Sequence, residues 1–207
     1  MAATNPCAEQ PLPPDGACLL GSVNLVRYLV PRMEVECPVT DEGDGPVYQV
    51  GWDFDWYQLE KDIPHIVRAM DNIVDRALYP LEPQYDEAVA KRRMGLGFTG
   101  FANTLEALGY AYGSPEFLEF GNELGEMFAN EVYSASALLA KEKGPFPLYL
   151  HDGYMSSKFI KRLNVYTKDL ITKHGLRNSH LLSIAPTGTI SLAADNVSSG
   201  IEPVFSL

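Results

Sequence analysis

Three side chains that can take part in catalysis lie at alternate positions near the start of the chain. Asn5, Cys7 and Glu9 supply an amide, a thiol and a carboxylate. In an extended segment, alternate side chains point to the same side. The spacing therefore predicts that these three groups meet on one side of a short, finger-like loop.

The chemistry of Cys7 has two interpretations when only its neighbours in sequence are considered. A cysteine flanked by an amide and a carboxylate could be a nucleophile, but cysteine proteases need a histidine base. None of the four histidines lies in a recognisable partner motif. The alternative is an unreactive thiol in a proline-rich loop, since a free cysteine is most often a small buried apolar residue.

Cys18 follows Cys7 by eleven residues and opens an apolar segment. The spacing allows a disulfide between the two, separate roles in one pocket, or a core position for Cys18 at the start of a strand. With Cys37 the chain has three cysteines, an odd number that is too few for a disulfide scaffold. The sequence contains neither a CxxC pair nor a Cys/His cluster, so we expect no metal site.

A second candidate site lies near the end of the chain, where an apolar segment runs into a turn with a glycine and three hydroxyls. Such a turn, followed by a helix, presents the free N–H groups of the helix start to an anion. The segment lacks the Gly-Lys-Ser/Thr of a Walker motif. The alternative is a helix that Ser or Thr caps for stability alone. The residues are Pro186, Thr187, Gly188, Thr189, Ile190 and Ser191.

Gly95, Gly97 and Gly100 have the spacing of a GxGxxG dinucleotide-binding motif. No acidic residue is clearly placed at the end of a following strand, which that motif requires. We therefore interpret these glycines as positions of close packing between a strand and a helix.

The segments around these residues differ in composition. Residues 5–16 contain four prolines and a Pro-Asp-Gly, so we expect an irregular loop. Residues 17–30 are mostly apolar and fit a strand followed by a short helix. Residues 38–51 are acidic and glycine-rich, which predicts an exposed excursion with a hairpin tip at Asp44-Gly45.

Two long helices are predicted from apolar residues spaced by threes and fours. Asp55 is placed to cap the first, whose apolar positions run from Leu59 to Leu78, and Pro64 should kink it or mark a late start. The second should run from Ser114 to Lys143. Between them we expect residues 93–101 to form a buried strand that turns into a helix, and this helix should run to Leu108 and stop at Gly109. A strand over 179–184 and a helix from residue 187 complete an α/β pattern.

Composition limits the function classes that the chain can serve. A length of 207 residues allows one large domain or two small ones, and 46% hydrophobic residues can form a core. The net charge of −11 argues against a surface that coats DNA or RNA, but not against a nucleotide site built on helix N–H groups. No apolar run approaches the roughly 20 residues of a membrane helix. The first residues lack the features of a signal peptide, so we expect a cytoplasmic protein.

Taken together and in this order, the motifs resemble the ribonucleotide reductases. The segment 5–14 with 16–25 resembles their radical-cysteine finger loop, and residues 91–97 resemble a barrel strand. Residues 177–203, which include the run from Pro186 to Ser191, resemble their phosphate-binding segment. The proline-rich sequence of the first loop is most similar to the adenosylcobalamin-dependent, class II branch of the family. Class I large subunits are the alternative.

The resemblance implies a fold and a set of roles. The whole chain, 1–207, would be a single partial domain of a ten-stranded α/β barrel whose finger loop carries the cysteine to its centre. Cys7 would be the thiyl radical, Glu9 the base on the ribose 3′ hydroxyl, and Asn5 a hydrogen-bond partner of the sugar. Cys18 would be one of two reducing thiols, and the backbone N–H groups of residues 187–190 would hold the substrate diphosphate. One departure from the family pattern is Ala8, where a glycine is usual.

The resemblance also implies what must come from elsewhere. The second redox cysteine belongs to an upstream strand, and Cys37 is a poor substitute for it. Most of the adenosylcobalamin surface and a C-terminal thiol pair have no counterpart here. We therefore expect a section of an oxidoreductase for deoxyribonucleotide synthesis. It would need the remaining reductase polypeptide, a ribonucleoside di- or triphosphate and a thioredoxin-type reductant. The alternatives are a class I fragment, whose radical comes from a partner subunit, and a non-catalytic nucleotide-binding remnant.

Overall fold

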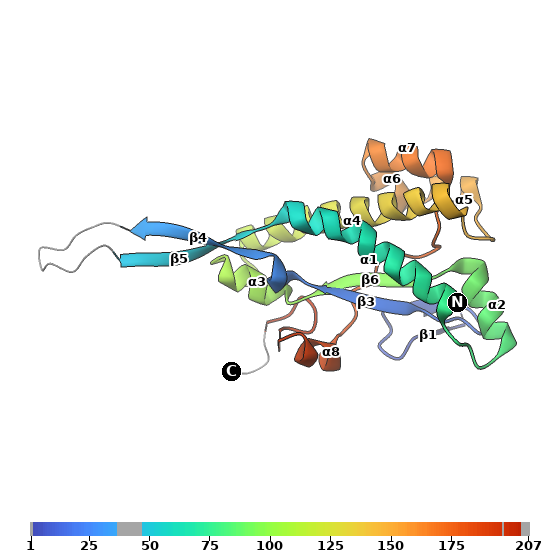
Figure 1. The fold of residues 1–207 in the computed structure, drawn as a ribbon, viewed down its shortest axis with the longest axis horizontal. Coiled ribbons are helices and arrows are strands. Elements are labelled where there is room, and N and C mark those ends of the chain that lie inside the picture. The colour runs from blue at the N-terminus through green and yellow to red at the C-terminus, as the bar shows by residue number, and fades with distance from the viewer. Residues whose placement is uncertain (1, 37–46, 196, 204–207) are drawn as a thin grey trace, which may run out of the picture.

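A computed structural model describes residues 2–36, 47–195 and 197–203, and the fold mixes helices with strands as the sequence predicts (Figure 1). The strands are β1 (Ala3–Thr4), β2 (Pro11–Leu12), β3 (Leu19–Asn24), β4 (Leu29–Glu36), β5 (Val47–Phe54) and β6 (Met94–Thr99). The helices are η1 (Leu25–Tyr28), α1 (Trp56–Arg76), α2 (Glu82–Lys91), α3 (Phe101–Ala107), α4 (Pro115–Lys143), α5 (His151–Ser156), α6 (Lys158–Arg162), α7 (Val165–His174) and α8 (Gly188–Ala193).

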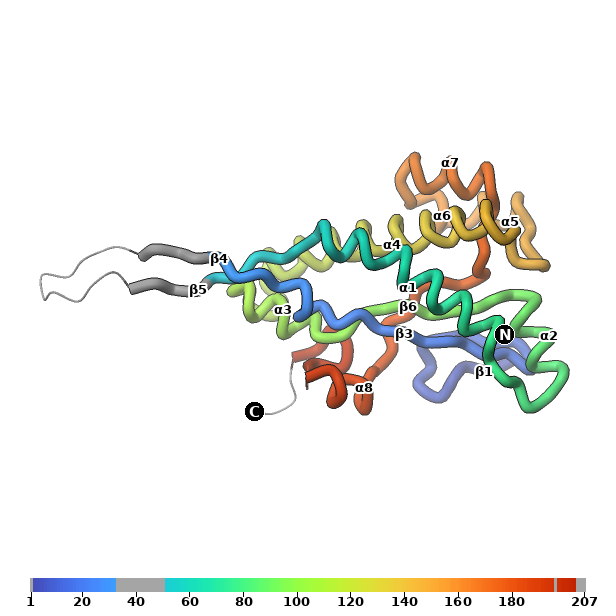
Figure 2. Tube along the Cα trace, viewed as in Figure 1, coloured from blue at the N-terminus to red at the C-terminus, as the bar shows by residue number. Residues whose placement is uncertain are grey.

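The parallel strands β3 and β6 form the centre of the molecule. Their register runs from Leu19 opposite Met94 to Asn24 opposite Thr99. The segment predicted as a strand at 179–184 lies along the other edge of β6, where it forms a single bridge between Leu96 and Leu182. Figure 2 shows this part of the chain returning from α7 past β6 to α8. Three extended segments therefore lie side by side and lead toward α8.

Two glycines of β6 allow the segment after α7 to approach closely. A Cβ added at Gly97 would lie 2.1 Å from the carbonyl oxygen of Ser183, and one at Gly95 would lie 2.8 Å from the side chains of Leu20 and Ser183. The prediction of close packing at these glycines is confirmed, although the close neighbours are extended segments and not a helix. Gly100 begins α3 with a φ of +72°, a conformation that L side chains rarely adopt.

Helix α1 begins where the sequence predicts. The Asp55 carboxylate accepts a hydrogen bond from the Gln58 N–H at 2.9 Å, which caps the helix. Pro64 lies inside the helix, so a late start is wrong. Ile73 is 48% exposed, and Leu78 lies beyond the end of the helix and is 97% exposed. These two apolar positions therefore do not belong to the buried face, which consists of Leu59, Ile63, Val67, Met70, Asp71 and Val74.

Helix α4 also has the predicted bounds. Ser114 caps its start by accepting a hydrogen bond from the Phe117 N–H at 3.2 Å, and Gly144 ends it with a φ of +83°. Its apolar face packs against α1 and α7 in one continuous core. Helices α2, α5, α6 and α7 were not predicted. Pro83 in the first turn of α2 and Asn164, which caps α7, are the signals that could have located two of them.

A short 3-10 helix follows β3 as expected, but the chain then enters the antiparallel pair of β4 and β5, which was not predicted. The Asp55 N–H donates to the Tyr28 carbonyl at 2.8 Å and closes the base of this pair. The predicted excursion at 38–51 is therefore partly wrong, because residues 47–51 belong to β5. Its remainder, with the predicted tip at Asp44-Gly45, lies outside the described residues.

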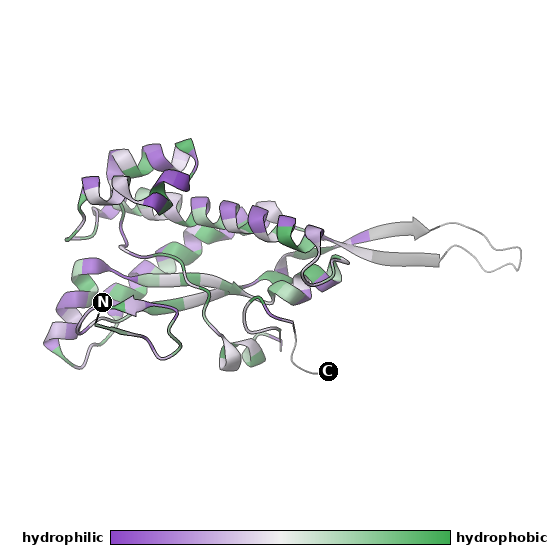
Figure 3. Ribbon diagram, turned by 180° about the vertical axis from the view of Figure 1, so that it is seen from behind, coloured by the Kyte–Doolittle hydropathy of each residue, from purple (hydrophilic) through white to green (hydrophobic). Residues whose placement is uncertain are grey.

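Within the described ranges the strands form three separate two-stranded pairs and no closed barrel. The mixed α/β class is confirmed, whereas the ten strands stay a prediction. In Figures 1 and 3, α4 and α7 lie on one side of the β3–β6 pair, and α8 and the β1–β2 loop lie on the other. The long helices cover one face of the central strands and leave the candidate site residues on the other.

The helices carry both polar and apolar residues, which Figure 3 shows as alternating purple and green along α4. Such alternation is typical of helices that bury one face and expose the other. None of the helices in the described part of the chain combines the length and the apolar character needed to cross a membrane.

Candidate active site

The first predicted site residues lie in a loop that the short strands β1 and β2 close. Ala3 pairs with Leu12, and the Asn5 N–H donates to the Gln10 carbonyl at 3.1 Å. The Asn5 carbonyl accepts from the Ala8 N–H at 3.0 Å, and the Asn5 side chain accepts from the Gln10 N–H at 3.0 Å. Residues 6–10 are therefore bent and not extended, because both oxygens of Asn5 fold the chain back on itself.

The two thiols have different environments. Cys7 is exposed and Cys18 is half-buried, and both are free cysteines. A disulfide between them is therefore not formed, and the interpretation of Cys7 as a buried apolar residue is wrong. Cys18 immediately precedes β3, which agrees with a position at the start of a strand. Cys37 lies outside the described residues.

The Cys18 thiol is affected by burial and by the charges of Arg93 and Glu9. Burial raises the pKa of the Cys18 thiol to about 11, with a further increase from the charge of Glu9, while the charge of Arg93 acts in the opposite direction. One carboxylate oxygen of Glu9 is buried and has no hydrogen-bond partner among the described residues. The fold thus brings a carboxylate with an unused acceptor close to a protonated thiol. Arg93, at the start of β6, was not predicted as part of this group.

The finger loop is fixed to the extended segment after α7 by two contacts. The buried Gln10 side chain donates to the Leu182 carbonyl at 3.3 Å, and the Ser183 hydroxyl donates to the Glu9 carbonyl at 3.5 Å. Pro186 comes three residues after Ser183, so these two residues are separated by at most roughly 11 Å. The loop that carries Cys7 therefore contacts the same segment that leads into the second candidate site.

That second site begins at Thr187, which is buried. Its hydroxyl donates to the Ser199 carbonyl at 2.8 Å and lies 3.0 Å from the Thr99 hydroxyl, while its N–H also donates to the Ser199 carbonyl at 2.8 Å. Its side chain makes no cap hydrogen bond to α8. The alternative of a helix capped by Thr187 is therefore wrong. The expectation that the Thr187 N–H is free for phosphate is also wrong, because the Ser199 carbonyl accepts from both its N–H and its hydroxyl.

The next three N–H groups are differently placed. Gly188, Thr189 and Ile190 are exposed and form the first turn of α8, where N–H groups have no acceptor within the helix. No acceptor for them occurs elsewhere in the ranges that the structure describes. The Ser191 hydroxyl donates to the Gly188 carbonyl at 2.8 Å and holds the turn together. The N–H groups of this turn can therefore donate hydrogen bonds to an anion.

Side chains at the carboxyl ends of β3 and β6 and in α3 hold the chain around α8. Asn24 donates from its side-chain amide to the Ala194 carbonyl at 3.1 Å, and Asn103 accepts from the Ser198 N–H at 2.7 Å. The Thr99 hydroxyl donates to the Ser198 carbonyl. These residues were not predicted, because their partners lie 95 or more positions away in the sequence. The Ser198 hydroxyl itself is buried and has no partner among the described residues.

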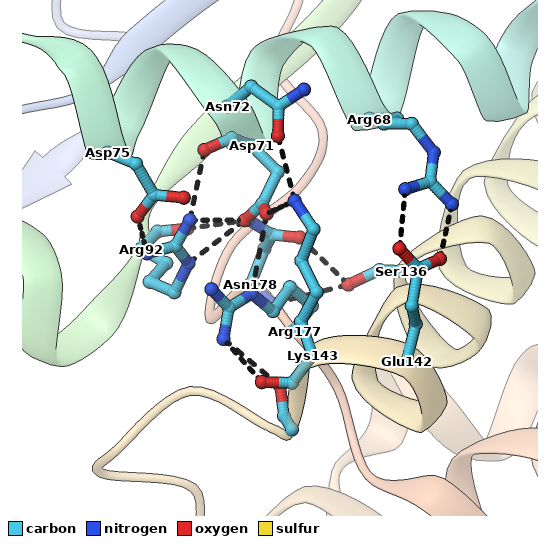
Figure 4. Close-up of polar contacts among 11 residues, drawn as sticks. Arg68, Asp71, Asn72, Asp75, Arg92, Ser136, Glu142, Lys143, Arg177 and Asn178 are labelled. Atoms are coloured by element: carbon cyan, nitrogen blue, oxygen red, sulfur yellow. Dashed lines mark hydrogen bonds and ion pairs between the residues drawn. The ribbon is translucent and has the colours of Figure 1, made fainter.

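A buried ionic network fixes the other end of these segments (Figure 4). Asp71 is fully buried and accepts from the Arg92 guanidinium at 2.7 and 2.9 Å and from the Asn178 amide at 3.1 Å. Arg177 and Lys143 each approach its other oxygen at 3.3 Å. Burial alone would raise the pKa of Asp71, but these partners, chiefly Arg92, hold it below its usual value. The network joins α1, α4, the start of β6 and the segment that leads to the site.

The described residues contain no group of His, Cys, Asp and Glu side chains that could hold a metal ion. The functional groups of the region are therefore thiols, a carboxylate, amides and backbone N–H groups. This set can exchange hydrogen atoms and protons with a ligand and can bind an anion.

Comparison with known proteins shows the family to which the chain is similar. The family model described as "Ribonucleotide reductase, barrel domain" matches residues 1–207. A vitamin B12-dependent ribonucleoside-diphosphate reductase of Mycobacterium tuberculosis is 36% identical over 205 residues, which cover 99% of this chain and 24% of that protein. The protein of the same name from Thermoplasma acidophilum is 35% identical over 205 residues, with 99% and 22% covered.

A third relative has a different name. The ribonucleoside-diphosphate reductase subunit alpha of Chlamydia trachomatis is 31% identical over 210 residues, which cover 91% of this chain and 18% of that protein. The chain thus spans less than a quarter of the length of these three relatives.

Proposed function

The chain belongs to the ribonucleotide reductase barrel-domain family, and we propose that it supplies part of the active site of an enzyme that reduces ribonucleotides to deoxyribonucleotides by thiyl-radical chemistry. The observation that carries this proposal is the contact of the Cys7 loop with the segment that runs into the free N–H groups of α8. One substrate could then meet the thiol at its sugar and the helix start at its phosphates. Because the chain spans only part of its relatives, the remaining polypeptide is needed to complete the site.

In the proposed reaction Cys7 acts as a thiyl radical and takes the hydrogen atom from the ribose C3′, so that an S–H bond forms as the C–H bond breaks. Glu9 takes the proton of the 3′ hydroxyl, and the buried carboxylate oxygen without a partner supports this role. Asn5 uses its side-chain oxygen within the loop, which leaves its NH2 group to donate to a sugar hydroxyl.

The 2′ hydroxyl then leaves as water, and two thiols supply two electrons and become a disulfide. Cys18 is one of these thiols in the proposal, and the second lies outside this chain. The raised pKa of Cys18 keeps it protonated at neutral pH, which suits a donor of hydrogen. Cys7 returns the hydrogen atom to C3′, and a thioredoxin-type dithiol reduces the disulfide for the next turnover.

The diphosphate of the substrate would bind at the start of α8. The exposed N–H groups of Gly188, Thr189 and Ile190 donate to the phosphate oxygens in this proposal, while Thr187 fixes the turn from its buried position. Binding through backbone groups suits an acidic chain, because it needs no lysine or arginine.

The names of two relatives suggest adenosylcobalamin as the source of the radical, since both are called vitamin B12-dependent. Cys7 is exposed, so its thiol fits a radical source that approaches from outside this chain. When bound, the cofactor would supply the radical that removes the thiol hydrogen of Cys7. We assign no residue of this chain to the binding of the corrin ring.

The similarity to the Chlamydia subunit alpha supports a second candidate, in which the radical comes from a partner subunit. The two candidates are separated by combining this chain with the remaining polypeptide, a ribonucleotide and a dithiol, and measuring deoxyribonucleotide. We expect product when adenosylcobalamin is added. Product only with an iron or manganese subunit would favour the second candidate. Nucleotide binding without product in either mixture would contradict both and indicate a non-catalytic remnant.

A further inference from the structure

A cavity of about 610 Å³ lies beside β2 and the residues that precede β6. Lys91, Arg93 and His180 line it together with Leu150, Tyr154 and Pro13. Its volume is in the range of small-molecule binding sites, about 300–1,000 Å³. The contacts proposed above for substrate do not use this cavity.

Arg93 is the unusual group in the cavity wall. It is 6% exposed, and its Nε has no hydrogen-bond partner among the described residues. Its ion pair with the Glu87 carboxylate is long, at 3.5 Å from Nη1, and Lys91 already approaches that carboxylate at 2.8 Å. A buried guanidinium with an unused N–H is unfavourable unless an acceptor is supplied. An anionic oxygen is the acceptor that pairs best with this group.

Apart from Ser157 and Ser179, the rest of the wall is mostly apolar. Leu148 and Leu150 are 55% and 73% exposed, and Phe146 and Tyr154 present aromatic rings beside them. The pKa of His180 is lowered by burial and then by the charges of Arg93 and Lys91, in agreement with a positive potential at the polar end. The cavity wall thus combines cationic side chains with apolar ones.

We propose that this cavity binds a small organic anion, whose phosphate or carboxylate group pairs with Arg93 and Lys91 and whose apolar body lies against Tyr154 and Leu150. The cavity uses none of the contacts proposed for the substrate, although Arg93 also lies near Cys18 of the proposed reductase site, and the inference does not depend on that function. The charge of Arg93 also acts on the Cys18 thiol. A bound anion would offset this charge and make the Cys18 thiolate harder to form.

The test uses the 207-residue chain and three probes: phenyl phosphate, inorganic phosphate and benzyl alcohol. NMR titration follows the Nε–H signal of Arg93 and the amide signals of Tyr154 and Ser179. We expect saturable shifts with both phosphates, about tenfold tighter binding of phenyl phosphate because its ring is buried, and no saturation with benzyl alcohol. Equal affinities for the two phosphates, or no saturation with either, would overturn the proposal.

Variants identify the residues that bind. Arg93→Gln should abolish the saturable shifts. Lys91→Gln should weaken the binding of both phosphates several-fold. Because Lys91 is more exposed than Arg93, this second variant guards against a folding defect in the first. Leu150→Ala should weaken phenyl phosphate alone. Lys173→Gln, in α7 and exposed, is the matched control and should change nothing. Equal effects of Lys91→Gln and Lys173→Gln would show that the anion binds by general charge, and the proposed site would be wrong.

A second readout follows the alkylation rate of Cys18 by mass spectrometry of its peptide. Saturating phenyl phosphate should slow this rate several-fold in the unmodified chain and have no effect in Arg93→Gln. A rate that is unchanged by phenyl phosphate in the unmodified chain would contradict the placement of the anion at Arg93.

Discussion

Ala8 holds the turn of the finger loop in a conformation that favours glycine. Its φ is +64°, and its N–H donates to the Asn5 carbonyl at 3.0 Å. A side chain with a Cβ adopts this region at a cost of roughly 1–2 kcal/mol. The hydrogen bonds of Asn5 and the pairing of β1 with β2 offset that cost, so the position of Cys7 depends on contacts on both sides of it.

Ala8→Gly should therefore stabilise the chain by about 0.5–1 kcal/mol, since the relief of the positive φ exceeds the added flexibility of the unfolded chain. Urea unfolding measures the change. Ala69→Gly, an exposed position inside α1, is the control and should destabilise by about 1 kcal/mol. A loss of stability of similar size in both variants would contradict the strain at Ala8.

Cys18 should react slowly with alkylating agents. Its pKa is raised from 9.0 to about 11, mainly by burial, so its thiolate fraction below pH 9 is about a hundredfold lower than that of an ordinary thiol. Its alkylation rate should keep increasing with pH until about pH 11. Peptide mass spectrometry at several pH values checks this, with the denatured chain as the control. A rate that levels off near pH 9 in the folded chain would contradict the raised pKa.

At the scale of elements, sequence reasoning was most accurate for α1 and α4. Their apolar residues recur with the helical period, and Asp55 and Ser114 cap them within a few residues, so all the information is local. The segment at 179–184 forms only one bridge, because its pairing depends on the glycines of β6 and not on its own composition. The finger loop was predicted to be extended and is bent, because its conformation also depends on specific contacts. Its turn is set by the two oxygens of Asn5, which a pattern of alternating residues does not reveal.

The contact between β6 and the segment after α7 can be tested at Gly97. A Cβ there would lie 2.1 Å from a backbone oxygen, so Gly97→Ala should destabilise the chain by several kcal/mol or prevent folding. Gly125→Ala, inside α4 with no atom within 4 Å of the added Cβ, should stabilise by about 0.5–1 kcal/mol. Thermal and urea unfolding measure both. A Gly97→Ala variant as stable as the unmodified chain would show that this approach is not close.

For the molecule as a whole, the Asp71 network joins segments that are far apart in sequence (Figure 4). Asn178 bonds to Asp71, to the Arg92 carbonyl and to Ser136 of α4, so one side chain links three parts of the fold. This network could not be predicted from the sequence. Asp71 lies on the buried face of α1, and the sequence does not show that its partners from other segments meet it there. The candidate site residues were proposed from their order along the chain, whereas the residues that hold α8 in place, Thr99, Asn24 and Asn103, were not predicted.

Asp71→Asn should cost about 3–5 kcal/mol, because it removes the buried charge partner of Arg92 and leaves only the partly exposed Asp75 to pair with it. Arg68→Ala, which removes the exposed ion pair with Glu142, is the control and should cost far less. The pKa of Asp71 in the folded chain is below its ordinary value of 3.8. Its contribution to the free energy of unfolding is therefore present above pH 3.8 and is lost as the pH falls through the folded pKa. The difference in unfolding free energy between the unmodified chain and Asp71→Asn should therefore be largest at neutral pH and decrease in acid. A difference that does not depend on pH would contradict the charged state of Asp71.

The central claim concerns Cys7 and is tested most directly by its replacement with serine. The chain with Cys7 or with Cys7→Ser is combined with the remaining polypeptide, adenosylcobalamin, a dithiol and a ribonucleotide. Deoxyribonucleotide formation and nucleotide binding are then measured on the same preparations. The unmodified protein should form deoxyribonucleotide, and Cys7→Ser should form none while it binds the nucleotide with unchanged affinity, because the Cys7 loop and the N–H groups of α8 are separate parts of the site. Deoxyribonucleotide formed by Cys7→Ser at the unmodified rate would contradict the proposed thiyl-radical mechanism.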